Sequence, residues 1–170
     1  MRKLFWVLLL LMPLSVVGQE PAKPNEAKKR TATLMAGLGN VFGWFGLHGE
    51  RYFGDDHLSA FVGVGYTPAP EEFDPSGPTF AIGVRGFTPG MKHRGFLALS
   101  LSQLALLSAF DPEERARFYG PGLEAGYHYA AWGGFTFMAS LGIGWAPGVP
   151  EGDKEVGEVL ALGFGYTWRK

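Results

Sequence analysis

Residues 158–170 read EVLALGFGYTWRK, and their pattern decides how the rest of the chain is interpreted. From Val159 onward, large apolar side chains alternate with small ones. Side chains alternate between the two faces of a β-strand, so this period of two predicts a strand. The large face holds Leu160, Leu162, Phe164, Tyr166 and Trp168, and the other face holds Val159, Ala161, Gly163, Gly165 and Thr167. One broad apolar face opposite a face of very small residues is unusual for a strand of a soluble protein.

The same alternation recurs seven times before this stretch. Each segment has about ten residues, the length of a strand that crosses a membrane at a tilt. The fifth segment is also compatible with a short buried helix, because its alternation breaks after Ser102, and its neighbours favour a strand. The eight predicted strands are Thr31–Gly39, Gly43–Phe53, Leu58–Thr67, Thr79–Phe87, Gly95–Gln103, Phe118–Tyr129, Gly133–Trp145 and Val159–Trp168.

The connections between these strands alternate in length. Short or intermediate connections at 54–57, 88–94 and 130–132 alternate with long ones at 68–78, 104–117 and 146–157. Barrels of the outer membrane have tight periplasmic turns at one end and longer extracellular loops at the other. The first connection, 40–42, is short where a long loop is expected. The sequence therefore predicts an all-β fold, an eight-stranded antiparallel up-and-down transmembrane β-barrel.

The composition agrees with this fold and excludes several classes of protein. Charged residues are 18% of the chain, aromatic residues are 15%, and 26 residues are glycine. The mean hydropathy is only slightly positive, which excludes a helical membrane bundle but suits a barrel, where one face of each strand meets lipid. The chain has no cysteine, which excludes disulfides, thiolate metal sites, thiol catalysis and a lipid-modified N-terminal cysteine.

The N-terminus has the pattern of a targeting segment. Arg2 and Lys3 precede the apolar stretch Leu4–Leu14, and Val16-Val17-Gly18 provides a small-residue cleavage pattern, so residues 1–18 are a predicted signal peptide. Without Arg2 and Lys3, 13 of the 15 basic residues remain against 16 acidic ones, which argues against a nucleic-acid partner. Residues 19–30 are predicted to be a flexible periplasmic tail, and residues 31–170 the outer-membrane barrel.

Aromatic residues lie near the predicted strand ends, where the girdles of a membrane barrel meet the lipid head groups. They are Tyr66, Tyr119, Tyr127, Tyr129, Trp132, Trp145, Tyr166 and Trp168. In this pattern the segment from Thr31 to Trp168 resembles the small eight-stranded outer-membrane β-barrels, the OmpA/OmpX-like group. The closing strands of that group carry a glycine and a terminal aromatic residue that the barrel-assembly machinery reads. Gly163, Tyr166 and Trp168 match this insertion signal, and Arg169 and Lys170 extend beyond the position where the family usually ends.

This resemblance implies a location in the cell outer membrane. The partners it implies are the lipid bilayer, lipopolysaccharide and, during insertion, the barrel-assembly machinery, and the chain is expected to be a monomer. The long connections are acidic, with Glu71, Glu72, Asp74, Asp111, Glu113, Glu114, Glu151, Asp153, Glu155 and Glu158. These side chains could hold divalent cations near lipopolysaccharide phosphates or meet a basic partner, or they could simply keep exposed loops soluble.

If the large faces meet lipid, the small faces line the lumen. A charge on the lipid face near the midplane costs about 2–4 kcal/mol, so strand charges are expected inside, each with a partner. Glu50 and Glu124 with Arg85 form the predicted buried network. The alternatives for this set are a packed polar core or a narrow conduit gated by arginine–glutamate exchange. The predicted lumen residues are His48, Glu50, Arg85, Ser100, Ser102, Glu124 and His128, joined by Thr136 and Ser140.

The sequence gives little support for metal binding, hydrolysis or nucleotide binding. His48 with Glu50, and Glu124 with His128, could bind a metal, but nothing else in the sequence supports one, and no cofactor is predicted. Ser100 or Ser102 with a histidine could form a hydrolase site, yet the sequence lacks a nucleophile elbow, so no catalytic residue is assigned. The glycine pairs such as Gly63/Gly65 lie within strands and indicate a narrow interior rather than a nucleotide loop.

These observations predict an integral outer-membrane β-barrel with a role in envelope structure, envelope integrity or surface interaction. One alternative is a narrow channel or a small-ligand-binding barrel, which bilayer conductance would distinguish. A second alternative is an outer-membrane lipid-modifying enzyme. The rival at the level of the fold is a soluble lipocalin-like barrel, which would refold in buffer without detergent.

Overall fold

The computed structural model of the chain describes residues 29–43, 45–67, 77–104, 118–146 and 156–170. The predicted signal peptide, the tail up to residue 28 and nearly all the acidic loop positions lie outside the described residues. Within the described part of the chain, no helix is long and apolar enough to cross a membrane.

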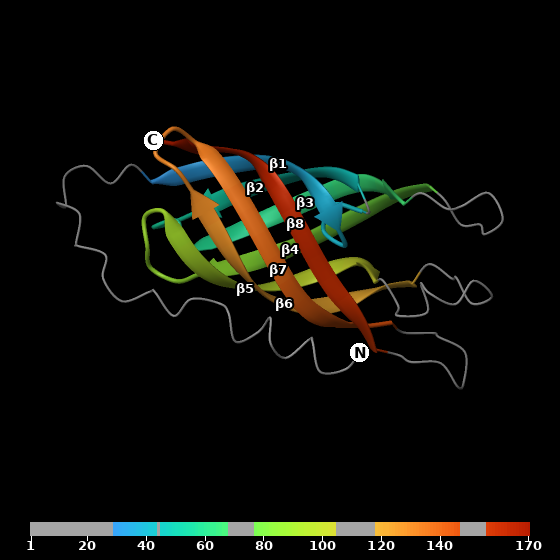
Figure 1. Cartoon of the computed structure of the whole chain (residues 1–170). Coiled ribbons are helices and arrows are strands. Elements are labelled where there is room, and N and C mark those ends of the chain that lie inside the picture. The colour runs from blue at the N-terminus through green and yellow to red at the C-terminus, as the bar shows by residue number, and fades with distance from the viewer. Residues whose placement is uncertain (1–28, 44, 68–76, 105–117, 147–155) are drawn as a thin grey trace, which may run out of the picture.

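Eight strands form one closed antiparallel barrel in which each strand pairs with its neighbours in sequence and β8 pairs with β1 (Figure 1). This confirms the predicted all-β, eight-stranded antiparallel up-and-down barrel, including the strand nature of the fifth segment. The strands are β1 (Arg30–Gly39), β2 (Phe45–Phe53), β3 (Leu58–Thr67), β4 (Gly77–Phe87), β5 (His93–Leu104), β6 (Phe118–Ala130), β7 (Phe135–Trp145) and β8 (Val156–Arg169).

Two predicted strands begin later than the sequence suggested, and glycine explains both differences. β2 starts at Phe45 instead of Gly43, and β7 starts at Phe135 instead of Gly133. Gly43 has a φ of 63° and Gly134 a φ of 92°, a left-handed conformation that glycine adopts without steric cost. These glycines therefore belong to turns, although they continue the alternating pattern of the strands that follow them.

The outer face of the barrel is apolar, and its interior holds both polar and apolar side chains. On β3, Val62 and Val64 face outward and are 51% and 55% exposed, whereas Ser59 and Phe61 face inward and are buried. The inward side chains of the eight strands are small, polar, aromatic or, as at Met35, Met138 and Val159, apolar, and they fill the interior. A barrel of eight strands is only wide enough for its own side chains to do so.

The two ends of the barrel differ. At one end, here called the turn end, short connections at 54–57, 88–92 and 131–134 join the strands, and β1 begins and β8 finishes there (Figure 1). At the opposite end, here called the loop end, β3–β4, β5–β6 and β7–β8 are joined by segments outside the described residues. Residues 40–43 also lie at the loop end, between β1 and β2.

The chain at Asn40–Gly43 folds into the mouth of the barrel. Val41 and Phe42 are 0% exposed, and Asn40 is fixed by three hydrogen bonds to the barrel wall. Its side-chain amide donates to the carbonyl of Gln103, its Oδ1 accepts from the backbone N–H of Leu160, and its own N–H donates to the Leu160 carbonyl. This explains why the first connection is short where the alternation of loop lengths predicts a long one.

Glycines of the wall leave the space that the inserted turn occupies. A Cβ on Gly65 would lie 1.8 Å from the Phe42 carbonyl oxygen, and one on Gly63 would lie 1.8 Å from the Val41 carbonyl oxygen. A Cβ on Gly163 would lie 2.4 Å from the tip of the Phe42 ring. These glycines therefore serve a specific fit, beyond keeping the interior narrow.

Replacing Gly65 with alanine tests this fit. We expect Gly65→Ala to destabilise the folded barrel by about 1–3 kcal/mol, because the new methyl group meets backbone atoms that cannot rotate away. Gly49→Ala is the matched control, since Gly49 also lies in a strand and its Cβ would meet nothing within 4 Å. The measurement is the urea midpoint of the two variants in detergent micelles. Equal midpoints for both would contradict the account of the inserted turn.

Candidate functional site

The centre of the interior holds a buried ion pair between β2 and β4. Arg85 Nη1 lies 3.1 Å from each carboxylate oxygen of Glu50, and both side chains are 0% exposed. Ser59 of β3 donates to Glu50 Oε1 at 2.5 Å, and Tyr52 donates to Oε2 at 3.3 Å. The carboxylate thus has one cation and two hydroxyl donors, so its burial is compensated by both charge and hydrogen bonds.

Two aromatic rings enclose the guanidinium of this pair. The Arg85 Cζ atom lies 4.5 Å from the centre of the Phe61 ring and 4.4 Å from that of Phe96. At these distances the negative faces of the rings attract the cation. The rings come from β3 and β5, on either side of the strand that carries Arg85, so the cation and its aromatic neighbours fill the middle of the lumen.

The second buried carboxylate, Glu124 of β6, has different partners from those predicted. Ser100 Oγ donates to its Oε1 at 2.8 Å, and Ser140 Oγ donates to its Oε2 at 2.9 Å. These serines come from the neighbouring strands β5 and β7. Among the described residues Arg85 pairs with Glu50, and no ion pair to Glu124 is present. The predicted network is therefore two separate carboxylate sites.

The two lumen histidines are also separate. His48 lies between the rings of Phe42 and Phe61, with ring centres 5.4 Å and 4.8 Å away, and neither of its nitrogens has a hydrogen-bond partner among the described residues. Its Nε2 is 3.9 Å from Glu50 Oε2. His48 therefore packs as an aromatic side chain that also contacts the edge of the ion pair.

His128 belongs to a chain of hydrogen bonds that enters from the turn end. Arg30 Nη1 lies 2.8 Å from His128 Nδ1, and Thr136 Oγ1 lies 3.0 Å from Nε2. Because arginine can only donate, Nδ1 accepts and Nε2 carries the proton. Thr136 in turn donates to the carbonyl of Tyr129 at 2.7 Å. The imidazole of His128 is therefore neutral and carries its proton on Nε2.

These contacts bear on the metal and hydrolase alternatives. His48 Nε2 lies 3.9 Å from Glu50 Oε2, but Glu50 is bound by Arg85, and His128 is bound by Arg30. In the part of the chain that the structure describes, no group of three or more potential ligands gathers around a metal position. The Ser100 hydroxyl donates to a carboxylate, whereas a nucleophilic serine donates to a histidine base. Ser102 is buried, and its hydroxyl has no partner among the described residues.

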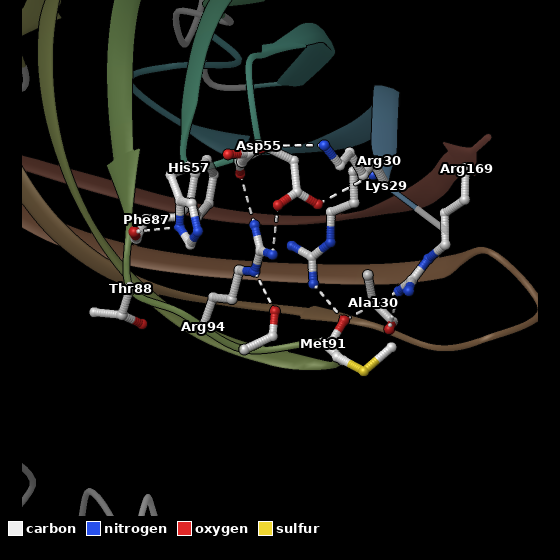
Figure 2. A network of polar contacts seen from close by, with 12 residues as sticks. Lys29, Arg30, Asp55, His57, Phe87, Thr88, Met91, Arg94, Ala130 and Arg169 are labelled. Carbon is white, nitrogen blue, oxygen red and sulfur yellow. Dashed lines mark hydrogen bonds and ion pairs between the residues drawn. The ribbon is translucent and has the colours of Figure 1, made fainter. Parts of the chain in front are cut away.

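A second polar cluster closes the turn end, and sequence reasoning missed it (Figure 2). Arg94 of β5 donates from Nη2 to Asp56 Oδ1 and from Nη1 to the Asp56 carbonyl, both at 2.6 Å. Asp56 Oδ2 accepts from the backbone N–H of Arg30 at 3.1 Å. Asp56 therefore ties the β2–β3 turn to β1 and β5. It adopts a φ of 59°, which is uncommon outside glycine.

Two more arginines complete this cluster. Arg30 Nη2 donates to the carbonyl of Met91 at 3.0 Å, and Arg169 Nη2 donates to the carbonyls of Met91 and Ala130 at 3.3 Å and 2.7 Å (Figure 2). On the rim, Lys29 donates to Asp55 at 2.5 Å, and this hydrogen bond lowers the pKa of the exposed Asp55 carboxyl. Arg30, predicted to lie in a flexible tail, is instead 3% exposed and pairs as the first residue of β1.

The chain matches no protein-family model, no curated protein and no solved structure.

The residues of the predicted insertion signal lie on the strand that closes the barrel. Gly163 faces inward against Phe42, whereas Tyr166 and Trp168 face outward, about half exposed, with ring centres 5.1 Å apart. The seven predicted lumen residues are all buried. The partners that the sequence analysis did not name, Tyr52 and Ser59, occupy the inward register of their strands, so the period of two could have identified them.

The central ion pair gives a testable prediction. Arg85→Met leaves Glu50 buried without its cation, and we expect it to lower the free energy of unfolding by about 3–5 kcal/mol. Arg51→Met is the matched control, because Arg51 lies on β2 and is exposed on the outer face; its effect should stay within about 0.5 kcal/mol. Urea titration in micelles measures both, and similar effects of the two substitutions would contradict the central role of the pair.

Proposed function

We propose that the chain is an integral outer-membrane β-barrel protein with a role in envelope structure or surface interaction, and that it is not an enzyme. The observation that carries this proposal is the apolar outer surface of the barrel. Large hydrophobic side chains from all eight strands are between 40% and 63% exposed. A soluble protein rarely exposes a continuous apolar patch above a few hundred Å². A surface of this kind is stable where lipid covers it.

The order of side chains along the strands supports a membrane crossing. Aliphatic residues such as Leu99, Val62 and Ile82 lie on the outer face at mid-strand. Aromatic residues lie at both margins: Phe45, Tyr66 and Trp145 at the loop end, and Phe53, Phe135, Tyr166 and Trp168 at the turn end. Aromatic belts of this kind sit at the two membrane–water interfaces. The strands have 9 to 14 residues, enough for a tilted crossing.

Two charged residues of the outer face also lie near the ends of their strands. Arg51 lies two residues before the end of β2 at the turn end, and Glu158 lies two residues after the start of β8 at the loop end. A long charged side chain near an interface can reach the head groups, whereas the same charge at the midplane is costly. Their positions are those that a membrane barrel tolerates.

The filled interior supports a structural role over conduction. The Arg85–Glu50 pair and its enclosing rings occupy the middle of the lumen, and the 0%-exposed Phe42 occupies the loop-end mouth. We expect no conductance steps when the wild-type barrel is inserted into planar bilayers. Regular single-channel steps would favour the narrow-channel alternative.

The remaining parts of the proposal concern targeting. A signal peptide at residues 1–18 would deliver the chain to the periplasm, and Gly163, Tyr166 and Trp168 would present the closing strand to the barrel-assembly machinery. The turn end would face the periplasm, as the short turns of outer-membrane barrels do, and the loop end would face lipopolysaccharide. The chain would act as a monomer.

A charge scan across the outer face tests the membrane proposal. We expect Leu99→Arg, in the middle of β5, to destabilise the barrel in lipid vesicles by about 2–4 kcal/mol, and Leu58→Arg, at the turn-end start of β3, by about 0–1 kcal/mol. Both leucines are more than half exposed, at 61% and 53%, so neither substitution disturbs a packed core. A soluble barrel would tolerate both changes alike, and equal effects would contradict the proposal.

A further inference from the structure

The turn end carries more positive charge than its carboxylates balance. Arg30, Arg94 and Arg169 converge there from β1, β5 and β8 (Figure 2). Lys92 lies in the neighbouring β4–β5 turn. Asp56 forms an ion pair with Arg94 at 2.6 Å. Among the described residues, no carboxylate pairs with Arg30, Arg169 or Lys92. Three cations therefore remain without an anionic partner within a small region.

Two of these cations flank one exposed aromatic side chain. The Arg169 Cζ atom lies 5.1 Å, and the Lys92 Nζ atom 5.4 Å, from the centre of the Trp132 ring. Trp132 belongs to the β6–β7 turn and is 53% exposed. The position of Arg169 is fixed, because its Nη2 donates to the carbonyls of Met91 and Ala130. Its Nη1 end makes no hydrogen bond among the described residues. A cation, an indole and a second cation are thus held together at the rim.

We propose that Lys92, Trp132 and Arg169 form a binding site for the phosphate of an anionic phospholipid in the leaflet at the turn end. This inference rests on the proposed function, because it needs the barrel to be in a membrane. Arginine and lysine are the side chains that bind phosphate, through directed N–H donors and through a compact charge respectively. Arg30 is buried and close enough to Arg169 to interact with it electrostatically, so it adds to the positive potential of the site.

The apolar and aromatic residues beside the site favour the phosphate of a lipid over a soluble phosphate. Phe135 and Tyr166 pair directly across β7 and β8 at the turn end, and both are about half exposed on the outer face. Tryptophan prefers the interface between head groups and acyl chains. A lipid whose phosphate contacts Lys92 and Arg169 could therefore lay its acyl chains on the apolar face beside them. The unbalanced charge favours an anionic head group over a zwitterionic one.

The site also gives a role to the last residue of β8. Arg169 follows Trp168 as the last residue of β8, and its side chain binds the carbonyls of Met91 in the β4–β5 turn and of Ala130 at the end of β6. Arg169 thus places a cation next to the aromatic residues of the turn end, at the level expected for the lipid head groups.

Native mass spectrometry of the folded barrel in detergent tests the proposal. The probes are short-chain phosphatidylglycerol, short-chain phosphatidylcholine and inorganic phosphate at equal concentrations. We expect phosphatidylglycerol to bind preferentially and Arg169→Gln or Lys92→Gln each to weaken its binding by about tenfold. Arg51→Gln is the matched control, because it removes an exposed charge near the same end with no tryptophan contact, and it should leave binding unchanged.

The other possible outcomes contradict either the lipid site, the choice of a lipid as its ligand, or the proposed function. Equal binding of phosphatidylglycerol and phosphatidylcholine, or an equal loss in Arg51→Gln and Lys92→Gln, overturns the lipid site. Binding of inorganic phosphate as strong as that of the lipid overturns the choice of a lipid. If Arg169→Gln does not fold, Lys92→Gln decides alone, because the Lys92 amine makes no hydrogen bond or ion pair among the described residues. A wild-type chain that stays folded and soluble without detergent overturns the proposed function itself.

Discussion

The pairing of β8 with β1 is the constraint on which the rest of the barrel depends. It runs from Arg30↔Arg169 at the turn end to Gly39↔Ala161 at the loop end, and it leaves no strand of the sheet with an unpaired edge. In a bilayer no water is present to satisfy an open edge, so closure is required before the outer face can meet lipid. Inside the barrel, Thr167 and Thr33 are hydrogen-bonded across this seam at 2.8 Å.

Closure also determines what the interior must contain. The interior combines a cluster of buried aromatic and methionine side chains with polar groups, and these polar groups need partners within the lumen. The seam is connected to the central pair through Tyr52. Thr33 Oγ1 lies 3.1 Å from the Tyr52 hydroxyl, which donates to Glu50 Oε2 at 3.3 Å. The ion pair with Arg85 completes this line from the closing strand to the far wall.

The period of two predicted the strands because alternation is a local property that each segment carries by itself. Phe42 could not be predicted to enter the mouth, because its fit depends on glycines from β3 and β8 that meet only when the barrel closes. The partners of Glu124 depend in the same way on strand register, which placed Ser100 and Ser140 beside it and Arg85 with Glu50. The arginines of the turn end lie at or beyond the ends of the alternating segments, where the period gives no information.

The central claim is that this surface belongs in a membrane, and refolding measures it most directly. The chain, unfolded in urea, is diluted into plain buffer and into detergent micelles or lipid vesicles, and each sample is run on an electrophoresis gel with and without boiling. The account predicts aggregation in buffer, and in micelles or vesicles a compact band whose mobility shifts on heating. A monodisperse, β-structured monomer in buffer without detergent would contradict it.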